Sequence, residues 1–289
     1  MQKIAIVTDS TADLPLSYYE ENNVQMVPLT VRFEEKSFKD WIDINPKEFY
    51  QRMRDSDILP KTSQPSVAQF AQVYQELAGE AEQIVSIHLS SELSGTVQAA
   101  EMARDMANVP VTVIDTKSAS LGTGLIVDAA VRAKRAGLSA EEVIKKGREA
   151  TDRIKIVFLV GTLKYLHLGG RIGKAQALLG SMLSIKPILT LNEGVVTPYK
   201  KVKGLKKAYS EMKSFFLQNV TGKGALYAVF AHADCLDEMQ RLREMIKSET
   251  RNAAALIESE IGSVIGTYVG PGAFAIAFYE DQADQEKGG

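Results

Sequence analysis

The chain has 289 residues, of which 45% are hydrophobic and 24% charged, values typical of a globular protein that folds in water. Its formal net charge of −2 gives no overall field that would attract nucleic acid or an anionic membrane. We find no run of about 18 apolar residues and no apolar leader segment, so we expect a protein that does not span a membrane. The single cysteine, Cys235, excludes an internal disulfide and suits a reducing cytoplasm, where we expect the protein to be.

Short apolar runs alternate with helical patterns through the first half of the chain. Runs typical of strands lie at residues 3–7, 24–33, 83–89 and 109–114. Helical spacing of apolar residues marks 66–79 and 118–137. This alternation predicts an α/β fold with a mostly parallel sheet that helices cover on both faces. We assign it to an N-terminal domain of residues 1–150.

The pattern changes near residue 151. An apolar run is followed by the glycine-rich "HLGGRIGKA" and by a predicted helix that ends before Pro187. Next comes a predicted hairpin that turns at Asn192–Gly194. Two amphipathic helices then alternate with three further apolar runs, up to residue 281. These elements predict a second α/β domain, residues 151–281, with a mixed or antiparallel sheet. A polar tail, residues 282–289, follows.

Four hydroxyl side chains gather directly after the run 83–89. They are Ser90, Ser91, Ser94 and Thr96. A strand-to-helix junction offers unpaired backbone N–H groups and a partial positive charge, and small hydroxyls add donors that rotate to suit an acceptor. The Lys-Ser/Thr ending of a nucleotide-binding loop does not occur here. The stretch therefore predicts a small neutral cup for one modest charge such as a carboxylate, although Ser94 could equally be an ordinary helix N-cap.

Two other stretches supply further donors. In "KTSQPS", Ser66 is a plausible N-cap, so the hydroxyls of Thr62 and Ser63 are free to face a ligand. Loops that follow neighbouring parallel strands share one rim, which favours a common site with Ser94. Near the C-terminus, "GTYVGPG" combines glycines with the Tyr268 phenol, and the glycines permit a close approach of backbone to a ligand.

An enzymatic function is the main alternative. Asp9 and Asp13 in "TDSTADLP" are close enough in sequence to suggest a metal-dependent phosphotransferase or hydrolase, although these residue types are also the usual caps and turns. His88, His167 and His232 lie within or beside apolar runs and have no metal-ligand spacing, which favours structural roles. We therefore expect no catalytic residues, no metal and no cofactor.

A third possibility is a regulatory protein that acts through a charged surface. The stretch "YKKVKGLKK" carries five lysines, among them Lys203, Lys206 and Lys207. Such a run is usually a solvated face, but it could also hold an acidic partner. Arg171, in "GGRIGKA", is a further candidate for display to a partner. The glycines around it do not form the order of a dinucleotide-binding fingerprint.

Seven motifs, taken together, resemble the DegV family. In chain order they are "TDSTADLP", "KTSQPS", "SSELSGT", "DTKSASLGTG", "LKYLHLGGRIGKA", "LLGSMLSIKPIL" and "GTYVGPG". The resemblance spans nearly the whole chain. It implies a bacterial fatty-acid-binding protein with a two-domain α/β fold, which holds a long-chain fatty acid between and within the domains. Some members deliver acyl chains to a fatty acid kinase, so it also implies a non-catalytic role in lipid transport and fatty acid metabolism.

The resemblance also implies which residues form the site. The carboxylate would lie on the hydroxyls of Thr62 and Ser94, beside Ser63, Gly95 and Thr96, and Arg171 would dock the kinase. The family often has histidine where this chain has Tyr268, which keeps a donor but removes an imidazole that could be protonated. Burial of about 14 methylenes would contribute roughly 11 kcal/mol before the costs of association. The apolar helix faces of "AQALLGSMLSI", residues 175–185, are candidates for the tunnel wall, and ordinary core is the alternative for most of these residues.

Overall fold

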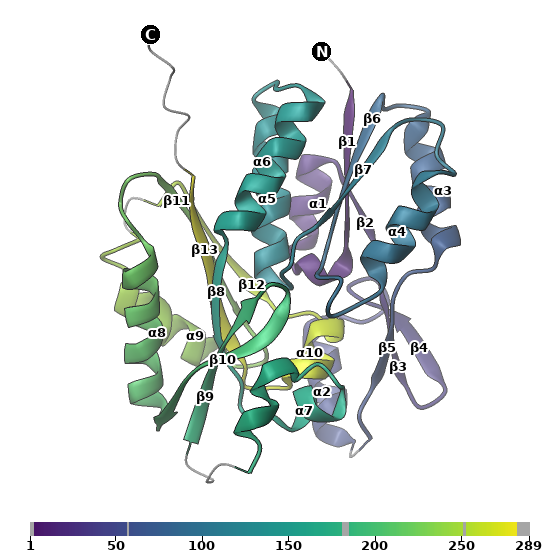
Figure 1. Ribbon diagram of the computed structural model, residues 1–289. Coiled ribbons are helices and arrows are strands. Elements are labelled where there is room, and N and C mark those ends of the chain that lie inside the picture. The colour runs from purple at the N-terminus through teal and green to yellow at the C-terminus, as the bar shows by residue number, and fades with distance from the viewer. Residues whose placement is uncertain (1–2, 57, 181–184, 251–252, 282–289) are drawn as a thin grey trace.

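The computed structural model describes residues 3–56, 58–180, 185–250 and 253–281, and the structural statements below refer to these residues. Two large sheets stand side by side, with one pair of helices between them (Figure 1). A small third sheet lies below the first. The predicted α/β fold is confirmed, with one fully parallel sheet and one mixed sheet.

The parallel sheet has four strands in the order β2-β1-β6-β7. Its strands are β1 Ile4–Asp9, β2 Val24–Val27, β6 Gln83–His88 and β7 Val111–Asp115. Helices α3 Val67–Ala78 and α4 Thr96–Arg104 pack on one face, and α5 Leu121–Arg135 and α6 Ala140–Arg153 pack on the other. Neighbouring residues of one strand serve opposite faces, as Ile6 and Val7 do, because successive side chains alternate. Helix α1 Leu16–Asn22 packs beside β2.

A three-stranded antiparallel sheet, in the order β4-β3-β5, was not predicted. Its strands are β3 Thr30–Phe33, β4 Lys36–Lys39 and β5 Lys61–Ser63. The apolar run 24–33 contains Pro28, which has no backbone N–H to give to a sheet. The run therefore divides into β2 and β3, which belong to different sheets. Helix α2 Pro46–Asp55 lies between β4 and β5 in sequence.

The second large sheet has six strands in the order β10-β9-β8-β13-β11-β12. Its strands are β8 Lys155–Leu159, β9 Ile185–Asn192, β10 Val195–Lys203, β11 Ala225–His232, β12 Ala255–Glu260 and β13 Phe274–Asp281. Only β11 and β12 pair in parallel. The predicted hairpin is confirmed as β9–β10. Helices α8 Leu205–Asn219 and α9 Leu236–Ile246 cover the outer face, while α5 and α6 contact the inner face.

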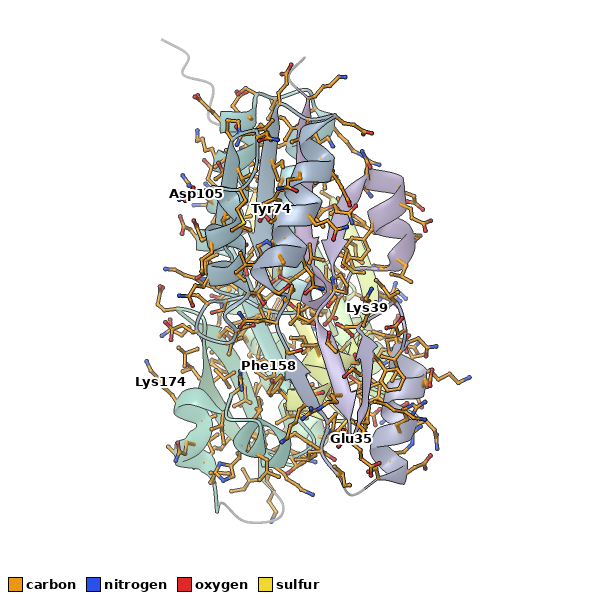
Figure 2. The ribbon with its side chains drawn as sticks, turned by 90° about the vertical axis from the view of Figure 1, so that its right-hand side faces the viewer. Glu35, Lys39, Tyr74, Asp105, Phe158 and Lys174 are labelled. Atoms are coloured by element: carbon orange, nitrogen blue, oxygen red, sulfur yellow. The ribbon has the colours of Figure 1, made fainter. Side chains whose placement is uncertain are left out.

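Because α5 and α6 pack against both large sheets, one buried cluster runs from Ile4 in β1 to Tyr279 in β13. Figure 2 labels Tyr74 and Phe158, which are buried in the upper and lower halves of the molecule respectively. The domain limits of 1–150 and 151–281 remain a prediction. The tail at 282–289 lies outside the described residues. None of the described helices is long and apolar enough to cross a bilayer.

The predicted helix before Pro187 is wrong for the described residues. The chain forms a short 3₁₀ helix, η2 Gly173–Leu178, and residues 181–184 lie outside the described part. Gly173 and Gly180 have φ angles of +51° and +79°, which a continuous α-helix cannot contain. Three other short helices complete the fold: η1 Ser10–Ala12, α7 Lys164–Leu168 and α10 Ser263–Val269.

Candidate functional site

A space lined almost entirely by hydrocarbon lies where the ends of the parallel strands face the six-stranded sheet. We call this space the apolar cavity. Its lining comes from the loop after β6, the start of α5, strands β8 and β13, the β9–β10 hairpin, and helices α7 and α10. The residues are Leu89, Leu93, Ala119, Ser120, Leu121, Ile156, Phe158, Leu166, Arg171, Leu191, Val196, Ile261, Ile265, Tyr268, Val269, Ala273, Phe274 and Ala275. All but Ser120, Arg171 and Tyr268 are apolar, so the space suits a hydrocarbon chain.

A second, polar pocket joins the apolar cavity. It is lined by Leu29, Thr62, Ser63, Gln64, Leu89, Leu93, Ser94, Arg171, Val264 and Tyr268. Four of these residues, Leu89, Leu93, Arg171 and Tyr268, also line the apolar cavity. The two spaces therefore share a wall, with hydroxyls on one side and hydrocarbon on the other. The structure brings together the predicted residues Thr62, Ser63, Ser94 and Tyr268, and adds Arg171.

Thr62 and Tyr268 form the closest pair of hydroxyls in this pocket. The Thr62 Oγ1 and the Tyr268 hydroxyl oxygen are 2.5 Å apart, although the residues are 206 positions apart in sequence. Thr62 is fixed by the pairing of β5 with β3. Tyr268 is fixed at the end of α10, where its ring lies so close to Gly169 that a Cβ there would collide with it. The absence of a side chain at Gly169 thus makes room for the Tyr268 ring.

The Ser94 hydroxyl does not cap helix α4. The N-cap of this helix is Gly95, and no side chain caps it, so the N-cap interpretation of Ser94 is wrong. The Ser94 Oγ instead lies 2.9 Å from Thr96 Oγ1 and lines the polar pocket. Gly95 and Thr96 are not in the lining. Gly95 joins the two hydroxyl loops, because its carbonyl accepts from Gln64 Nε2 at 3.1 Å.

The other two hydroxyls of the cluster have structural partners. Ser90 Oγ donates to the carbonyl of Gly194 at 3.1 Å, which holds the tip of the β9–β10 hairpin on the N-terminal half. Ser91 Oγ donates to Asp115 Oδ2 at 2.5 Å. The hydroxyl cluster at 90–96 therefore has two separate uses. Ser90 and Ser91 brace loops, whereas Ser94 lines the polar pocket and the buried Thr96 hydroxyl contacts the Ser94 hydroxyl from behind.

Arg171 is the one cation in the lining of either space among the described residues. Its Nε donates to the carbonyl of Leu93 at 3.1 Å, and its Nη1 donates to the carbonyl of Gly169 at 2.9 Å. The guanidinium lies over the Tyr268 ring, 5.0 Å from the ring centre. The side chain is exposed, so it places a positive charge at the mouth of the site. A role in docking a kinase remains a prediction.

Asp9 and Asp13 turn to different partners. Asp9 accepts from Thr11 N at 3.0 Å and caps η1, while its other oxygen accepts from Leu89 N at 3.2 Å. Asp13 accepts from Ser120 Oγ at 2.6 Å. Within the described ranges, no group of three or more His, Cys, Asp or Glu side chains could hold a metal ion. The geometry gives no support to a metal-dependent enzyme built on this pair.

Sequence reasoning missed a buried row of polar side chains. His88 Nδ1 donates to Asp9 Oδ2 at 2.9 Å, which leaves Nε2 to accept from Ser86 Oγ at 2.7 Å. This order is that of a serine hydrolase triad. All three residues are 0% exposed, however, and Ser86 Oγ accepts from Tyr74 at 2.8 Å. None of these three residues lines either space, so the row has no access to a substrate. The bond between Tyr74 and Ser86 links α3 to the sheet.

For the described part of residues 175–185, the structure favours the core alternative over the tunnel wall. Ala175 and Leu178 are buried in the core but do not line the apolar cavity. Residues 181–184 lie outside the described residues. The wall instead uses Leu166 of α7 and the hairpin residues Leu191 and Val196.

The whole chain was compared with known families and structures. It matches the model of the DegV family of uncharacterised proteins over residues 3–281. This chain belongs to the DegV family. A DegV domain-containing protein of Halalkalibacterium halodurans is 36% identical over 281 residues, which cover 96% of this chain and 99% of the relative.

Two solved structures carry the same fold. A DegV family protein from Thermus thermophilus, described for its fatty acid binding, has a TM-score of 0.93 and 38% identity, and the match covers 97% of this DegV chain and 100% of the other. DegV from Bacillus subtilis, described as a fatty acid binding protein, has a TM-score of 0.89 and 32% identity, with 97% and 100% covered. The family and the fold predicted from the seven motifs are therefore confirmed.

Proposed function

We propose that this DegV protein binds a long-chain fatty acid of the palmitate or oleate class. The carboxylate would lie in the polar pocket and the acyl chain in the apolar cavity. The observation that carries the proposal is the shared wall of the two spaces, where the Thr62–Tyr268 pair and Ser94 meet a lining that is otherwise hydrocarbon. The two similar structures described as fatty-acid-binding proteins support it.

The hydroxyl pair suits a carboxylate. Only one hydrogen can lie between Thr62 Oγ1 and the Tyr268 oxygen at 2.5 Å, so the other hydroxyl hydrogen is available to an acceptor in the pocket. The Ser94 hydroxyl adds a donor, and the Arg171 charge lies at the mouth. Neutral donors next to one cation match a single negative charge better than a polyphosphate.

The apolar cavity supplies most of the binding free energy. Each methylene removed from water contributes about 0.8 kcal/mol, so about 14 methylenes give roughly 11 kcal/mol. Loss of free motion and ordering of the chain oppose this gain, at a cost of about 4–15 kcal/mol. The polar contacts then fix the orientation of the ligand, with its acid end at the mouth.

The same site supports a carrier in preference to an enzyme. The lining of the two spaces contains no His, Asp, Glu or Cys among the described residues, so no general base lies beside the carboxylate. We propose that a separate fatty acid kinase phosphorylates the exposed acid end and that the protein then holds the acyl phosphate. Arg171, exposed beside the mouth, is the residue we propose for docking the kinase. The protein would thus act in lipid transport and fatty acid metabolism.

Native mass spectrometry tests the binding proposal. Delipidated protein incubated with palmitate or oleate should gain the mass of one fatty acid, and the double variant Thr62→Val with Ser94→Ala should lose this gain while staying folded. The matched control is Ser91→Ala. The Ser91 hydroxyl belongs to the same loop as Ser94, but it donates to Asp115 and does not line the polar pocket. An unchanged mass of the wild-type protein after incubation would contradict the proposal. Equal retention in the double variant would contradict the assigned head-group site.

A further inference from the structure

Four distant segments meet at a buried junction behind the apolar cavity. Asp13 follows η1, Asp40 follows β4, Ser120 precedes α5, and Ser263 begins α10. Lys39, labelled in Figure 2, marks the end of β4 directly before Asp40. Asp13 and Asp40 are 1% and 0% exposed. We call these four residues, with Trp41 and Gly262, the acid junction.

Asp13 holds two walls of the apolar cavity. Its Oδ2 accepts from Ser120 Oγ at 2.6 Å, and Ser120 lines the cavity at the start of α5. Its Oδ1 accepts from the backbone N–H of Gly262 at 3.0 Å and from Trp41 Nε1 at 3.3 Å. Gly262 immediately follows the wall residue Ile261 and precedes α10.

Asp40 holds α10 itself. Its Oδ1 accepts from the backbone N–H of Ser263 at 2.9 Å and from Ser263 Oγ at 2.5 Å. Its Oδ2 is buried and has no hydrogen-bond partner among the described residues. Helix α10 carries Ile265, Tyr268 and Val269 into the cavity wall. A proton on Oδ2 would leave both bonds to Ser263 intact.

We propose that Asp13 and Asp40 are positioning residues for the α10 wall, and that the protons they carry couple ligand exchange to pH. This inference rests on the proposed fatty-acid site. With both acids of the acid junction protonated, α10 stays docked and the ligand is retained. A charge on Asp40 in this dry site loosens α10 and the Tyr268 donor, a further charge on Asp13 adds repulsion between the two carboxylates, and the ligand exchanges faster.

The electrostatics of the pair agree with this geometry. Burial raises the pKa of Asp40 to about 6, against the hydrogen bonds from Ser263 that lower it. Burial, with the neighbouring Asp40 charge, also raises the pKa of Asp13 well above its ordinary value. Both effects disfavour two negative charges in one dry site. The pair therefore releases its protons in steps that belong to both residues.

Other titratable groups face the pair. Tyr19 of α1 and Tyr50 of α2 lie beside it, and Cys235 and Glu260 lie beside Tyr50; Asp9 also acts on Tyr19. Burial raises the pKa of both tyrosines well above 10.0 and that of the Cys235 thiol to about 12. These three groups stay neutral between about pH 5 and 8, so they do not supply the charge change.

His232 is the nearby group whose titration would also produce a pH-dependent transition. It pairs with Glu260 across β11 and β12, and burial lowers its pKa from the ordinary 6.5. The histidine gains a positive charge as pH falls, whereas the acid junction loses a negative one. The variant His232→Gln removes the imidazole and leaves the acid junction, so it distinguishes their contributions to the pH dependence.

The sign of the pH effect follows from the raised pKa. An acid whose pKa is higher in the docked state stabilises that state at low pH, and this stabilisation is lost as pH rises through the docked-state value. For Asp40 the window runs from 3.8 to about 6. If undocking restores the ordinary pKa of Asp40, its two units alone correspond to a change of about 100-fold in the undocking equilibrium.

Fluorescence of the ligand-free protein tests the junction directly. Trp41 is the single tryptophan of the chain and donates to Asp13. We expect a fluorescence transition near pH 6 in the wild-type protein and in His232→Gln. The midpoint of the transition should change in Asp40→Asn, where Asp13 titrates without the Asp40 charge, and should move to higher pH in Ser263→Ala, which removes a bond to the charged form. The matched control Asp43→Asn, an exposed neighbour, should behave as wild type.

Release of radiolabelled palmitate to phosphatidylcholine vesicles tests the coupling. The ratio of wild-type to Asp40→Asn release rates should rise between pH 5 and 8, because effects of pH on the fatty acid itself cancel in the ratio. A constant ratio, or an unchanged transition in Asp40→Asn, overturns the inference. If Asp40→Asn does not fold, an unmoved midpoint in Ser263→Ala overturns it. The fluorescence result needs no ligand, so it separates failure of this inference from failure of the proposed function.

Discussion

Replacing Tyr268 by phenylalanine removes one oxygen atom from the polar pocket and leaves the wall of the apolar cavity in place. The ring keeps its position against Gly169 and under the Arg171 guanidinium, 5.0 Å from the ring centre. What is lost is the bond to Thr62 Oγ1 at 2.5 Å and, with a ligand bound, a donor to its carboxylate. The variant therefore isolates the hydroxyl from the ring.

The magnitude follows from the charge of the acceptor. A hydrogen bond to a charged group contributes about 1.5–3 kcal/mol, and each 1.4 kcal/mol is a factor of ten in Kd. We expect Tyr268→Phe to weaken binding of palmitate by roughly 10- to 150-fold. The loss should be similar for a shorter and a longer acid, because the methylene contacts do not change.

Isothermal titration with delipidated protein measures this loss. The matched control is Tyr165→Phe, because the Tyr165 ring packs against Gly270 outside the polar pocket. Its Kd should stay within a factor of about two of the wild-type value. Wild-type affinity in a folded Tyr268→Phe protein would refute the reasoning, as would a loss that grows with chain length.

Three other outcomes follow from the same contacts. Gly194→Val places a side chain at a φ of +79° against Ser90, so thermal or urea unfolding should show a loss of at least about 1–2 kcal/mol; wild-type stability would contradict the contact. Arg171→Gln should slow association of the fatty acid at low salt and remove most of its salt dependence, and a stopped-flow salt series that matches wild type would contradict a role for this charge. Tyr268→His should make affinity fall as pH rises through about 6.5, and a Kd that is constant from pH 5.5 to 8 would contradict the placement of residue 268 at the carboxylate.

The strands and most helices could be predicted from local patterns. Apolar runs of four to eight residues mark buried strands, and spacing of Phe70 and Tyr74 marks the buried side of α3. The three-stranded sheet was not predicted because Pro28 divides one apolar run between two sheets. The short η2 helix was not predicted because Gly173 in it and Gly180 after it take positive φ angles, and sequence alone does not fix the conformation of a glycine.

The hydrogen-bond donors of the candidate site could be predicted from the sequence. Which of them face the pocket and which brace loops could not. Ser90 and Ser94 look alike in the sequence, and their separate uses depend on Gly194, which is 104 positions from Ser90. The acid junction is harder still to foresee, because Asp40 contacts Ser263 at a separation of 223 positions. Single carboxylates after strands are ordinary caps and turns. Only the fold brings two of them into one dry space.

The apolar cavity is built from the core itself. Ile261 and Phe158 are 4% and 8% exposed and are wall residues at the same time, so burial does not distinguish a tunnel residue from a packing residue. Deleting such a side chain leaves a void that costs about 2–5 kcal/mol, which means that the cavity cannot be enlarged cheaply. Its size is set instead where small residues stand in the wall, as Ala273 does directly before β13 and Ala275 does within this strand. In the proposed fatty-acid site, selection among acyl chains would therefore act through these alanines without removing contacts that hold the two sheets together.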